Sequence, residues 1–356
     1  MTHRIALKAS LLYGLLAAST LSLPACAANE QAAPPVTNEP AAPVTADAAP
    51  AKPDFESWKA DLRAEALAKG ISPATFDAAF AGVAPIPRII ELDRYQPERT
   101  KTFAEYRKGS VSDTRVARGR AMLAENRALL EEIGAQYGVQ PRFIVALWGL
   151  ETNYGANTGG FSVIAALATL AYDDRRPTFF RKELLLALQI LQEGHIAPAD
   201  MKGSWAGAMG QAQFMPSSFT RFAEDHDGDG HRDIWGTRAD VFASAAKYLS
   251  SVGWSDNLTW GRQILLPAGF DMSLASPSPR GPFVKKTLTE WQALGVRRAD
   301  GGELPIRDIE GSIVLPDGVG GEAYLVYGNY HALLDWNRSL FFATSIGLLS
   351  DRIAAP

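Results

Sequence analysis

Apolar side chains recur every three or four residues through most of the chain after residue 54, and this is the spacing of one face of an α-helix. The stretch that begins at Phe55 continues it with Trp58 and Leu62, and Ser72 before Pro73 marks the start of a second, short helix. The spacing predicts further helices over residues 103–111, 116–137, 141–151, 161–172, 179–193, 217–225, 240–252 and 330–353. The chain is therefore predicted to be mainly α.

One segment has a different pattern. Between Trp254 and Tyr327, short β-prone runs (RQILLP, GSIVLP and AYLVY) are separated by glycine, proline and aspartate, as in strands joined by turns. This predicts a small β-containing insertion in a helical body, so the fold class is α+β with helix dominant. The proline-punctuated stretch over 83–97 carries no predicted helix.

The N-terminus has the shape of a secretory signal. Basic residues up to Lys8 precede an uncharged run over 9–23, which is too short for a membrane-spanning helix. The only cysteine, Cys26, ends a Leu-Pro-Ala-Cys sequence that resembles a bacterial lipobox, whose cysteine becomes the lipidated first residue of the mature protein. Residues 1–26 are therefore expected to be a signal peptide with a lipobox.

The residue after Cys26 is Ala27 and not aspartate, which resembles the sorting pattern for the outer membrane. We expect a periplasmic protein anchored to the outer membrane through Cys26. The alternative is an A-x-A cleavage site formed by Ala25 and Ala27, which would remove Cys26 and release a soluble exported protein.

Residues 27–54 contain alanine, proline and polar residues with almost no large apolar side chains. Such a segment buries too little surface to offset the entropy of ordering, so a disordered tether is expected. The folded part is then predicted over 55–356, divided into an α region (55–140), a core (141–253), the β-containing subdomain (254–329) and a C-terminal helix (330–353).

Composition narrows the function. The 356 residues are 47% hydrophobic and 21% charged, as in globular proteins, and the net charge of −4 argues against nucleic acid as a partner. One cysteine excludes an intrachain disulfide and multi-cysteine zinc sites. Five histidines without an HExxH pair, and the lack of a GxSxG elbow, a P-loop or a dinucleotide fingerprint, argue against zinc, serine-hydrolase and nucleotide chemistry. No organic cofactor is expected.

Glu151 is the first candidate for chemistry. It ends the apolar run PRFIVALWGLE, where the negative end of the helix dipole and loss of hydration both disfavour the ionised carboxylate. A raised pKa would suit a general acid that protonates a glycosidic oxygen. The alternative is an ordinary exposed glutamate at a fraying helix end.

The second candidate is the run KGSWAGAMGQAQFMPSSF over 202–219. Its glycines allow a ligand to approach the backbone, while Ser204 and Gln213 offer hydrogen bonds and Trp205 and Phe214 offer flat apolar faces. That mixture suits a sugar, which has apolar ring faces and hydroxyl edges. Close packing of two helices through small residues is the alternative.

The third candidate is the acidic run DHDGDGHRD over 225–233. Its acids stand at positions 1, 3, 5 and 9 of an EF-hand loop, with glycine at position 6 and His231 at position 7, where only a backbone carbonyl is needed. Position 12 is glycine, so Asp240 is the candidate for the late ligand. We expect a structural Ca²⁺, with an acidic turn that binds no metal as the alternative. The candidate ligands are Asp225, Asp227, Asp229, His231 and Asp240.

Four motifs in this order, GLETNYG, SVIAALATLAYD, KGSWAGAMGQAQFMPSSF and DHDGDGHRDIW, resemble the lytic transglycosylase B family of bacterial cell-wall enzymes. The resemblance spans about residues 55–352. It implies a lysozyme-like catalytic core with an N-terminal α region and a small β-containing insertion. It also implies a monomeric enzyme that acts on peptidoglycan glycan strands, cleaving the β-1,4 bond between N-acetylmuramic acid and N-acetylglucosamine without water and leaving a 1,6-anhydromuramyl end.

By that resemblance Glu151 is the single catalytic acid and base, and the acetamido group of the substrate stabilises the cationic centre, so no second enzyme carboxylate is needed. In the family, a Tyr-Asn pair near the C-terminus faces the catalytic glutamate, and by the resemblance this pair corresponds here to Trp336 and Asn337. The substrate-binding residues implied by the resemblance are Ser204, Gln213, Tyr248, Asn337 and Tyr106, with Trp336 and Phe342 as aromatic substitutes.

Two rival functions stay open on the sequence. A hydrolytic muramidase of the same fold would need a second carboxylate across the cleft, for which Asp173 or Asp174 is the candidate. A non-catalytic peptidoglycan-binding lipoprotein would use the aromatic groove and the acidic loop for adhesion alone.

Overall fold

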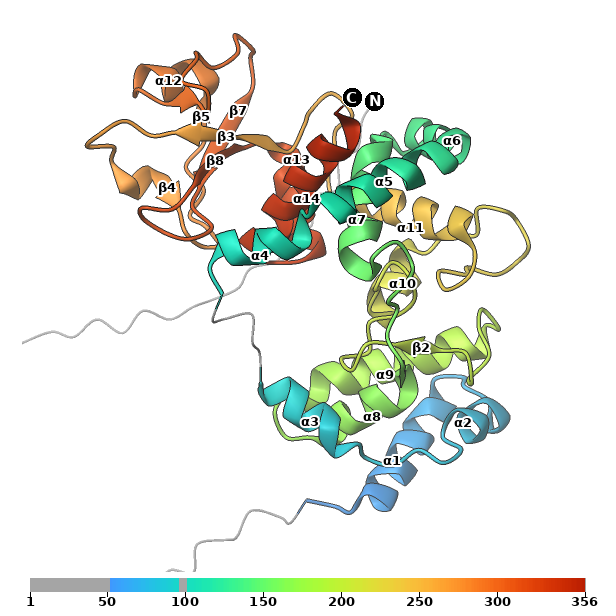
Figure 1. Ribbon diagram of the computed structural model, residues 1–356. Coiled ribbons are helices and arrows are strands. Elements are labelled where there is room, and N and C mark those ends of the chain that lie inside the picture. The colour runs from blue at the N-terminus through green and yellow to red at the C-terminus, as the bar shows by residue number, and fades with distance from the viewer. Residues whose placement is uncertain (1–51, 96–100, 356) are drawn as a thin grey trace, which may run out of the picture. The chain divides into compact units, whose positions relative to one another are not determined.

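The computed structural model describes residues 52–95 and 101–355 (Figure 1). The predicted signal peptide, Cys26 and most of the tether lie outside the described residues. Helices dominate, as predicted. They are α1 (Phe55–Ala68), α2 (Pro73–Ala79), α3 (Pro87–Arg94), α4 (Phe103–Ser110), α5 (Asp113–Glu125), α6 (Arg127–Tyr137), α7 (Pro141–Thr152), α8 (Val163–Tyr172), α9 (Pro177–Gln192), α10 (Pro216–Phe222), α11 (Arg238–Ser251), α12 (Leu288–Ala293), α13 (Gly328–Trp336) and α14 (Leu340–Ala354).

The first helices begin where the sequence supplies caps. The carboxylate of Asp54 accepts a hydrogen bond from the Ser57 amide at 2.9 Å, which satisfies one of the free N–H groups of the first turn of α1. Lys52 forms an ion pair with Asp174 at 3.1 Å. Lys52 and Asp54, at the end of the predicted tether, therefore make specific contacts with the folded part.

Helix α3 lies inside the stretch over 83–97 for which no helix was predicted. Pro87 occupies its first turn, where the missing N–H has no intrahelical partner to lose. Ile89 and Asp93 are buried on one side of the helix. Pro87 therefore starts a helix in this stretch.

Two long helices of the prediction are each divided in the structure. The helix over 116–137 breaks at Asn126, whose side-chain amide donates to the Met122 carbonyl at 2.8 Å. The helix over 330–353 breaks at Asn337, where the backbone turns to an extended conformation. Ser339 then caps α14 by accepting a hydrogen bond from the Phe342 amide. At each break a side chain bonds a backbone group, and apolar periodicity does not register such bonds.

The main hydrophobic core gathers around α7, which is buried from Phe143 to Gly149. Helix α7 packs against α14, α5 and α6, while α8 packs along α9 and α3 (Figure 1). This core includes buried residues from Leu62 to Ile353. The predicted N-terminal α region and catalytic core therefore share one hydrophobic interior.

The predicted β-containing insertion is present. A sheet has the strand order β4-β7-β8-β3-β6, with β5 paired to β7, and a separate two-stranded ladder joins β1 to β2. Only the β4–β7 pairing in the larger sheet is parallel. A second core around Trp291, Ile313 and Leu325 lies wholly within this segment. The strands are β1 (Phe161–Ser162), β2 (Lys202–Gly203), β3 (Gly261–Leu265), β4 (Ala275–Ser276), β5 (Lys286–Thr287), β6 (Arg297–Arg298), β7 (Glu310–Val314) and β8 (Ala323–Val326).

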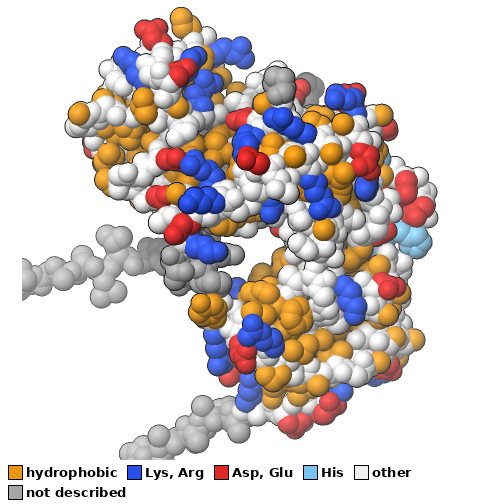
Figure 2. Space-filling model, in the orientation of Figure 1, with side chains coloured by type: hydrophobic (Ala, Val, Ile, Leu, Met, Phe, Trp, Pro, Cys, Tyr) orange, Lys and Arg blue, Asp and Glu red, His pale blue; other side chains and the backbone are white. Residues whose placement is uncertain are grey.

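Surface charge is mixed on the face shown in Figure 2, where Lys and Arg side chains alternate with Asp and Glu. This distribution agrees with the small net charge of −4. Among the described residues, helices long and apolar enough to cross a bilayer are absent.

Candidate active site

Glu151 lies in the last turn of α7. The helix ends there because Asn153 and Tyr154 adopt left-handed backbone conformations, with φ of 50° and 60°. Gly149 makes room for this return of the chain, since a Cβ on it would lie 2.5 Å from the Tyr154 ring. The Glu151 side chain is half-buried, which excludes the alternative of a freely exposed glutamate at a fraying end.

The Glu151 carboxyl group borders a small, largely apolar cavity. Trp336 donates a hydrogen bond from Nε1 to Glu151 Oε1 at 2.7 Å. Burial raises the pKa of Glu151 to about 7, against an ordinary value of 4.5, and the hydrogen bond from Trp336 opposes part of that rise. The expected rise is confirmed, and burial is its main cause. The cavity is lined by Ile144, Leu147, Trp148, Glu151, Gln211, Ala212, Val241, Phe242, Ala245 and Trp336.

An aromatic cluster surrounds Trp336. Its ring lies 4.7 Å from the ring of Tyr248 and 5.3 Å from that of Phe214, measured between centroids. The Tyr248 hydroxyl donates to the Asp335 carbonyl at 2.7 Å. The carboxyl group therefore lies beside the meeting point of three separate elements, which are α11, α13 and the glycine-rich segment.

The glycine-rich segment over 202–219 is a turn and bridge structure followed by α10, and not the helix crossing that was the alternative. Met209 bridges to both Gly203 and Phe214. Gly210 has φ of +61°, and a Cβ there would lie 2.5 Å from the Ile234 carbonyl oxygen. This close approach requires glycine.

Gln211 connects that segment to α7. Its side-chain oxygen accepts from Trp148 Nε1 at 2.8 Å, and its amide nitrogen donates to the Trp235 carbonyl at 2.8 Å. Because Gln211 and Trp148 both line the Glu151 cavity, this connection holds the segment beside the carboxyl group. The wall from α11, formed by Val241, Phe242 and Ala245, was not predicted, since those residues fit an ordinary core pattern.

Other predicted binding residues have defined positions. The Ser204 hydroxyl accepts hydrogen bonds from the Ala206 and Ala208 amides. Gln213 has φ of 51° and donates to the Thr158 carbonyl at 3.1 Å. Asn337 is exposed directly after Trp336.

Of the two predicted aromatic substitutes, only Trp336 lies beside Glu151. Phe342 is 5% exposed and packs in the hydrophobic core, a position that favours a structural role for its ring. Tyr106 lies on α4, where its ring is 5.6 Å from that of Phe341.

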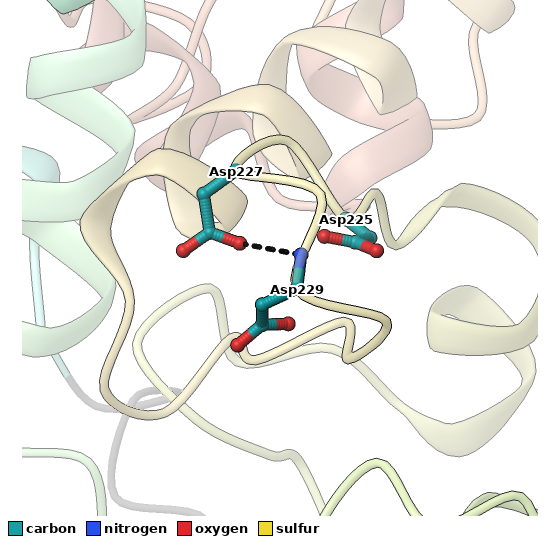
Figure 3. Close-up of side chains that lie close together, drawn as sticks. All are labelled: Asp225, Asp227 and Asp229. Atoms are coloured by element: carbon teal, nitrogen blue, oxygen red, sulfur yellow. Dashed lines mark hydrogen bonds between the residues drawn. The ribbon is translucent and has the colours of Figure 1, made fainter.

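The acidic loop lies between α10 and α11. Ligand oxygens of Asp225, Asp227 and Asp229 lie within 4.8 Å of one another, and Figure 3 shows the three side chains around the turn. Asp225 accepts hydrogen bonds from the Gly228 and Gly230 amides, which curl the loop around it. Such a group of carboxylates fits a hard divalent cation.

Asp240, the candidate for the late ligand, lies behind the acidic loop. It is fully buried, and its two oxygens accept the backbone amides of His226 at 2.8 Å and Asp233 at 2.7 Å. Its hydrogen bonds therefore hold the two ends of the loop together. Asp240 is not part of the three-carboxylate group. The His231 ring contacts the segment after α9, with Nδ1 3.0 Å from the Gly194 carbonyl oxygen.

Comparison with known proteins identifies the family. The model of the Transglycosylase SLT domain matches residues 54–351. Membrane-bound lytic murein transglycosylase B of Escherichia coli K12 is 31% identical over 255 residues, which are 71% of this chain and 67% of that protein. The chain belongs to the family of lytic transglycosylases.

Solved structures agree with this assignment. SltB3 from Pseudomonas aeruginosa, crystallised with NAG-NAM-pentapeptide, is 46% identical with a TM-score of 0.81, over 85% of this chain and 80% of SltB3. SLT35 from Escherichia coli, crystallised with calcium, shares the fold at 24% identity and a TM-score of 0.70, over 85% of this chain and 93% of SLT35. The predicted family, the lysozyme-like fold class and the prediction of a peptidoglycan lytic transglycosylase are confirmed.

The transglycosylase does not present Asp173 or Asp174 to Glu151. Asp173 lies 3.5 Å from Arg94, and Asp174 is 86% exposed and paired with Lys52. Neither residue lines the Glu151 cavity, and within the described part of the chain that cavity has no second carboxyl group. This arrangement argues against the paired-carboxylate chemistry of a hydrolytic muramidase.

The raised pKa predicts how Glu151 affects the stability of the transglycosylase. The folded state holds the proton more tightly than the unfolded chain, so this contribution is complete below pH 4.5 and is lost as pH rises through 7. The difference of about 2.5 pKa units corresponds to about 3 kcal/mol. We expect Glu151→Gln to gain stability relative to the natural protein, by up to that amount, between pH 4.5 and 8. Equilibrium unfolding of both proteins at pH 4.5 and at pH 8 measures their free energies of unfolding. If the difference between the two proteins is the same at both pH values, the burial of the Glu151 carboxyl group is contradicted.

Proposed function

We propose that Glu151 alone supplies both proton transfers of a non-hydrolytic cleavage of the bond between N-acetylmuramic acid and N-acetylglucosamine. The observation that carries the proposal is a single carboxyl group with a pKa of about 7 beside an apolar cavity. Near neutral pH such a group is present in both protonation states, so it is able to donate a proton and later to accept one.

In the first step the protonated Glu151 carboxyl gives its proton to the glycosidic oxygen as the bond from that oxygen to C1 of muramic acid breaks. The carbonyl of the substrate's 2-acetamido group stabilises the cationic centre at C1. In the second step the C6 hydroxyl oxygen bonds to C1 and its proton passes to the Glu151 carboxylate. The products are a glycan with a free N-acetylglucosamine hydroxyl and a 1,6-anhydromuramyl end, and the carboxyl group is restored.

The surroundings of Glu151 support this sequence of steps. Trp336 donates to Oε1, which orients the carboxyl group and stabilises the carboxylate formed after the first transfer. The apolar wall from α11 limits access of water, the competing nucleophile. A relative, SltB3, has been crystallised with NAG-anhNAM-pentapeptide, a ligand with an anhydro end.

We assign the glycan contacts to Ser204, Gln213, Tyr248 and Asn337, with the Trp336 ring as an apolar platform. Tyr248 and Trp336 contact each other, and Ser204 and Gln213 belong to the segment that Gln211 holds against α7. Tyr106 is a further glycan contact in this proposal.

The product end tests the proposed reaction. Purified peptidoglycan is digested with the enzyme and then treated with borohydride, which reduces a free muramic acid end and leaves a 1,6-anhydro end unchanged. The proposal predicts new ends that resist reduction, in proportion to the bonds cut. New ends that are all reducible would identify a hydrolase.

We also assign a structural Ca²⁺ to the acidic loop, held by Asp225, Asp227 and Asp229 with the backbone carbonyl of His231. Three carboxylates with their oxygens within 4.8 Å repel one another without a cation. The support is this donor set, which is all oxygen as Ca²⁺ prefers, and the crystal structure of SLT35, a protein of the same fold, with calcium.

Calcium is therefore expected to raise the melting temperature by about 5 °C at saturating concentration, and chelator to reverse the rise. Asp227→Asn, which removes one of the clustered charges, should abolish most of the effect. Asp308→Asn, at an exposed aspartate outside the loop, is the matched control and should keep it. If melting of the natural protein is the same in calcium and in chelator, the loop holds no structural ion.

We propose, finally, that the enzyme is a monomer anchored through lipid on Cys26 to the periplasmic side of the outer membrane. The lipobox-like sequence and the relative named as membrane-bound support the anchor. Cys26→Ser is expected to move the protein from the membrane fraction to the soluble fraction and to abolish labelling by fatty acid. Full labelling of that variant would contradict the assignment, and light scattering of the purified protein tests the monomer.

A further inference from the structure

A second pocket lies beside α13, the helix that carries Trp336 at its end. It has a volume of about 320 Å³ and is lined by residues from the loop before β5 and from α13 and the turn after it. We call it the basic pocket and define it by Arg280, Phe283, His331, Asp335 and Arg338.

The basic pocket is coupled to the active site through adjacent residues. Asp335 lines it, while the next residue, Trp336, contacts Glu151. The Asp335 carbonyl accepts the Tyr248 hydroxyl, so the same turn of α13 is held by a residue of the aromatic cluster. A ligand that bridges the two sites would therefore need to extend only around one turn of helix.

The charge of the basic pocket is unbalanced. Arg280 and Arg338 are exposed, and the only carboxylate in the lining, Asp335, lies 3.7 Å from Arg338. For Arg280, the described residues provide no ion-pair partner. Phe283 packs edge-on against His331, with ring centroids 4.8 Å apart, and gives the pocket an apolar floor. Two guanidinium groups beside an apolar surface favour an anionic ligand with small apolar side chains.

We propose that the basic pocket binds carboxylates of the peptide attached to muramic acid, with Arg280 and Arg338 as the contacts. This inference rests on the proposed function and adds peptide recognition to it. The peptide of peptidoglycan carries alanine methyl groups and free carboxylates, and it leaves the sugar at the lactyl group of the residue being cleaved. The relative SltB3 has been crystallised with a disaccharide that bears such a peptide.

Binding in the inactive Glu151→Gln background tests the inference without relying on turnover. The ligands are NAG-NAM-pentapeptide and NAG-NAM with its lactyl carboxylate capped as an amide, titrated by calorimetry. Adding Arg280→Gln and Arg338→Gln together should weaken pentapeptide binding about tenfold or more and change capped-disaccharide binding less than twofold. Arg127→Gln, at an exposed arginine of α6 that also has an acidic neighbour on its own helix, is the matched control and should change neither.

Equal weakening for the two ligands, or no weakening for the pentapeptide, would overturn peptide recognition by this pocket. Failure of the proposed function would give a different result. In that case the natural enzyme makes no anhydro ends, with or without peptide on its substrate. Melting temperatures of all variants exclude a loss of fold as the cause of weaker binding.

Discussion

Glu151→Gln is expected to reduce turnover of peptidoglycan by about three orders of magnitude or more while the protein stays folded. Glutamine has nearly the same shape, but its amide has no proton to give to the glycosidic oxygen and does not accept one from the C6 hydroxyl. The loss should appear in kcat, with little change in the affinity for glycan, because the contacts assigned to the sugar come from other residues.

The fold of this variant is expected to be as stable as that of the natural enzyme or more stable above neutral pH, since an amide in the apolar surroundings of Glu151 has no charge to desolvate. Glu131→Gln, at an exposed glutamate of α6, is the matched control and should keep full activity. Rates of release of soluble muropeptides from peptidoglycan measure both variants. Activity of Glu151→Gln near that of the control would show that another group transfers the proton.

Trp336→Phe is the second change with a large expected effect. It removes the N–H that donates to Glu151 Oε1 and favours the ionised carboxyl group, so the pKa of Glu151 should rise above its value of about 7. A hydrogen bond to a charged group contributes about 1.5 to 3 kcal/mol, which corresponds to a rise of about one pKa unit or more. Because the first step needs the protonated acid, the alkaline limb of the kcat/KM profile should move to higher pH by the same amount.

The maximal rate of Trp336→Phe should also fall, since the carboxyl group loses its orienting partner. Trp336→Tyr retains a hydrogen-bond donor and should return the alkaline limb toward that of the natural enzyme. Tyr248→Phe loses a bond to the Asp335 carbonyl and none to Glu151, so its alkaline limb should stay in place. A profile of Trp336→Phe that coincides with that of the natural enzyme would remove Trp336 from the control of the pKa.

Sequence predicts those parts of the site in which neighbouring residues show both a structural pattern and a reactive or ligating side chain. Glu151 ends an apolar helix, and the acids at 225, 227 and 229 have the spacing of a cation loop, so each was found from neighbouring residues alone. Helix positions followed from apolar spacing, because burial of one face decides where helices form.

The remaining features depend on contacts between distant residues. Trp336 is 185 positions from Glu151, and local sequence pattern does not predict that their side chains meet. Only the resemblance to the family indicated that Trp336 faces Glu151. Trp336 and Phe342 were equally plausible aromatic contacts in sequence, yet the turn at Asn337 directs α14 so that Phe342 enters the core. Asp240 carries a carboxylate, as a calcium ligand would. Only the structure shows that this carboxylate accepts two backbone amides and so supports the loop.

The source of the atoms at the newly formed muramic acid end tests the central claim most directly. Peptidoglycan is digested in water enriched in ¹⁸O, and the released muropeptides are weighed by mass spectrometry. If Glu151 directs the C6 hydroxyl to C1, the new ends are 1,6-anhydro forms, lighter than the hydrolysis products by one water, and contain no ¹⁸O. Reducing ends that carry one ¹⁸O atom would show that water attacks C1, and the proposed role of Glu151 in a cleavage without water would be wrong.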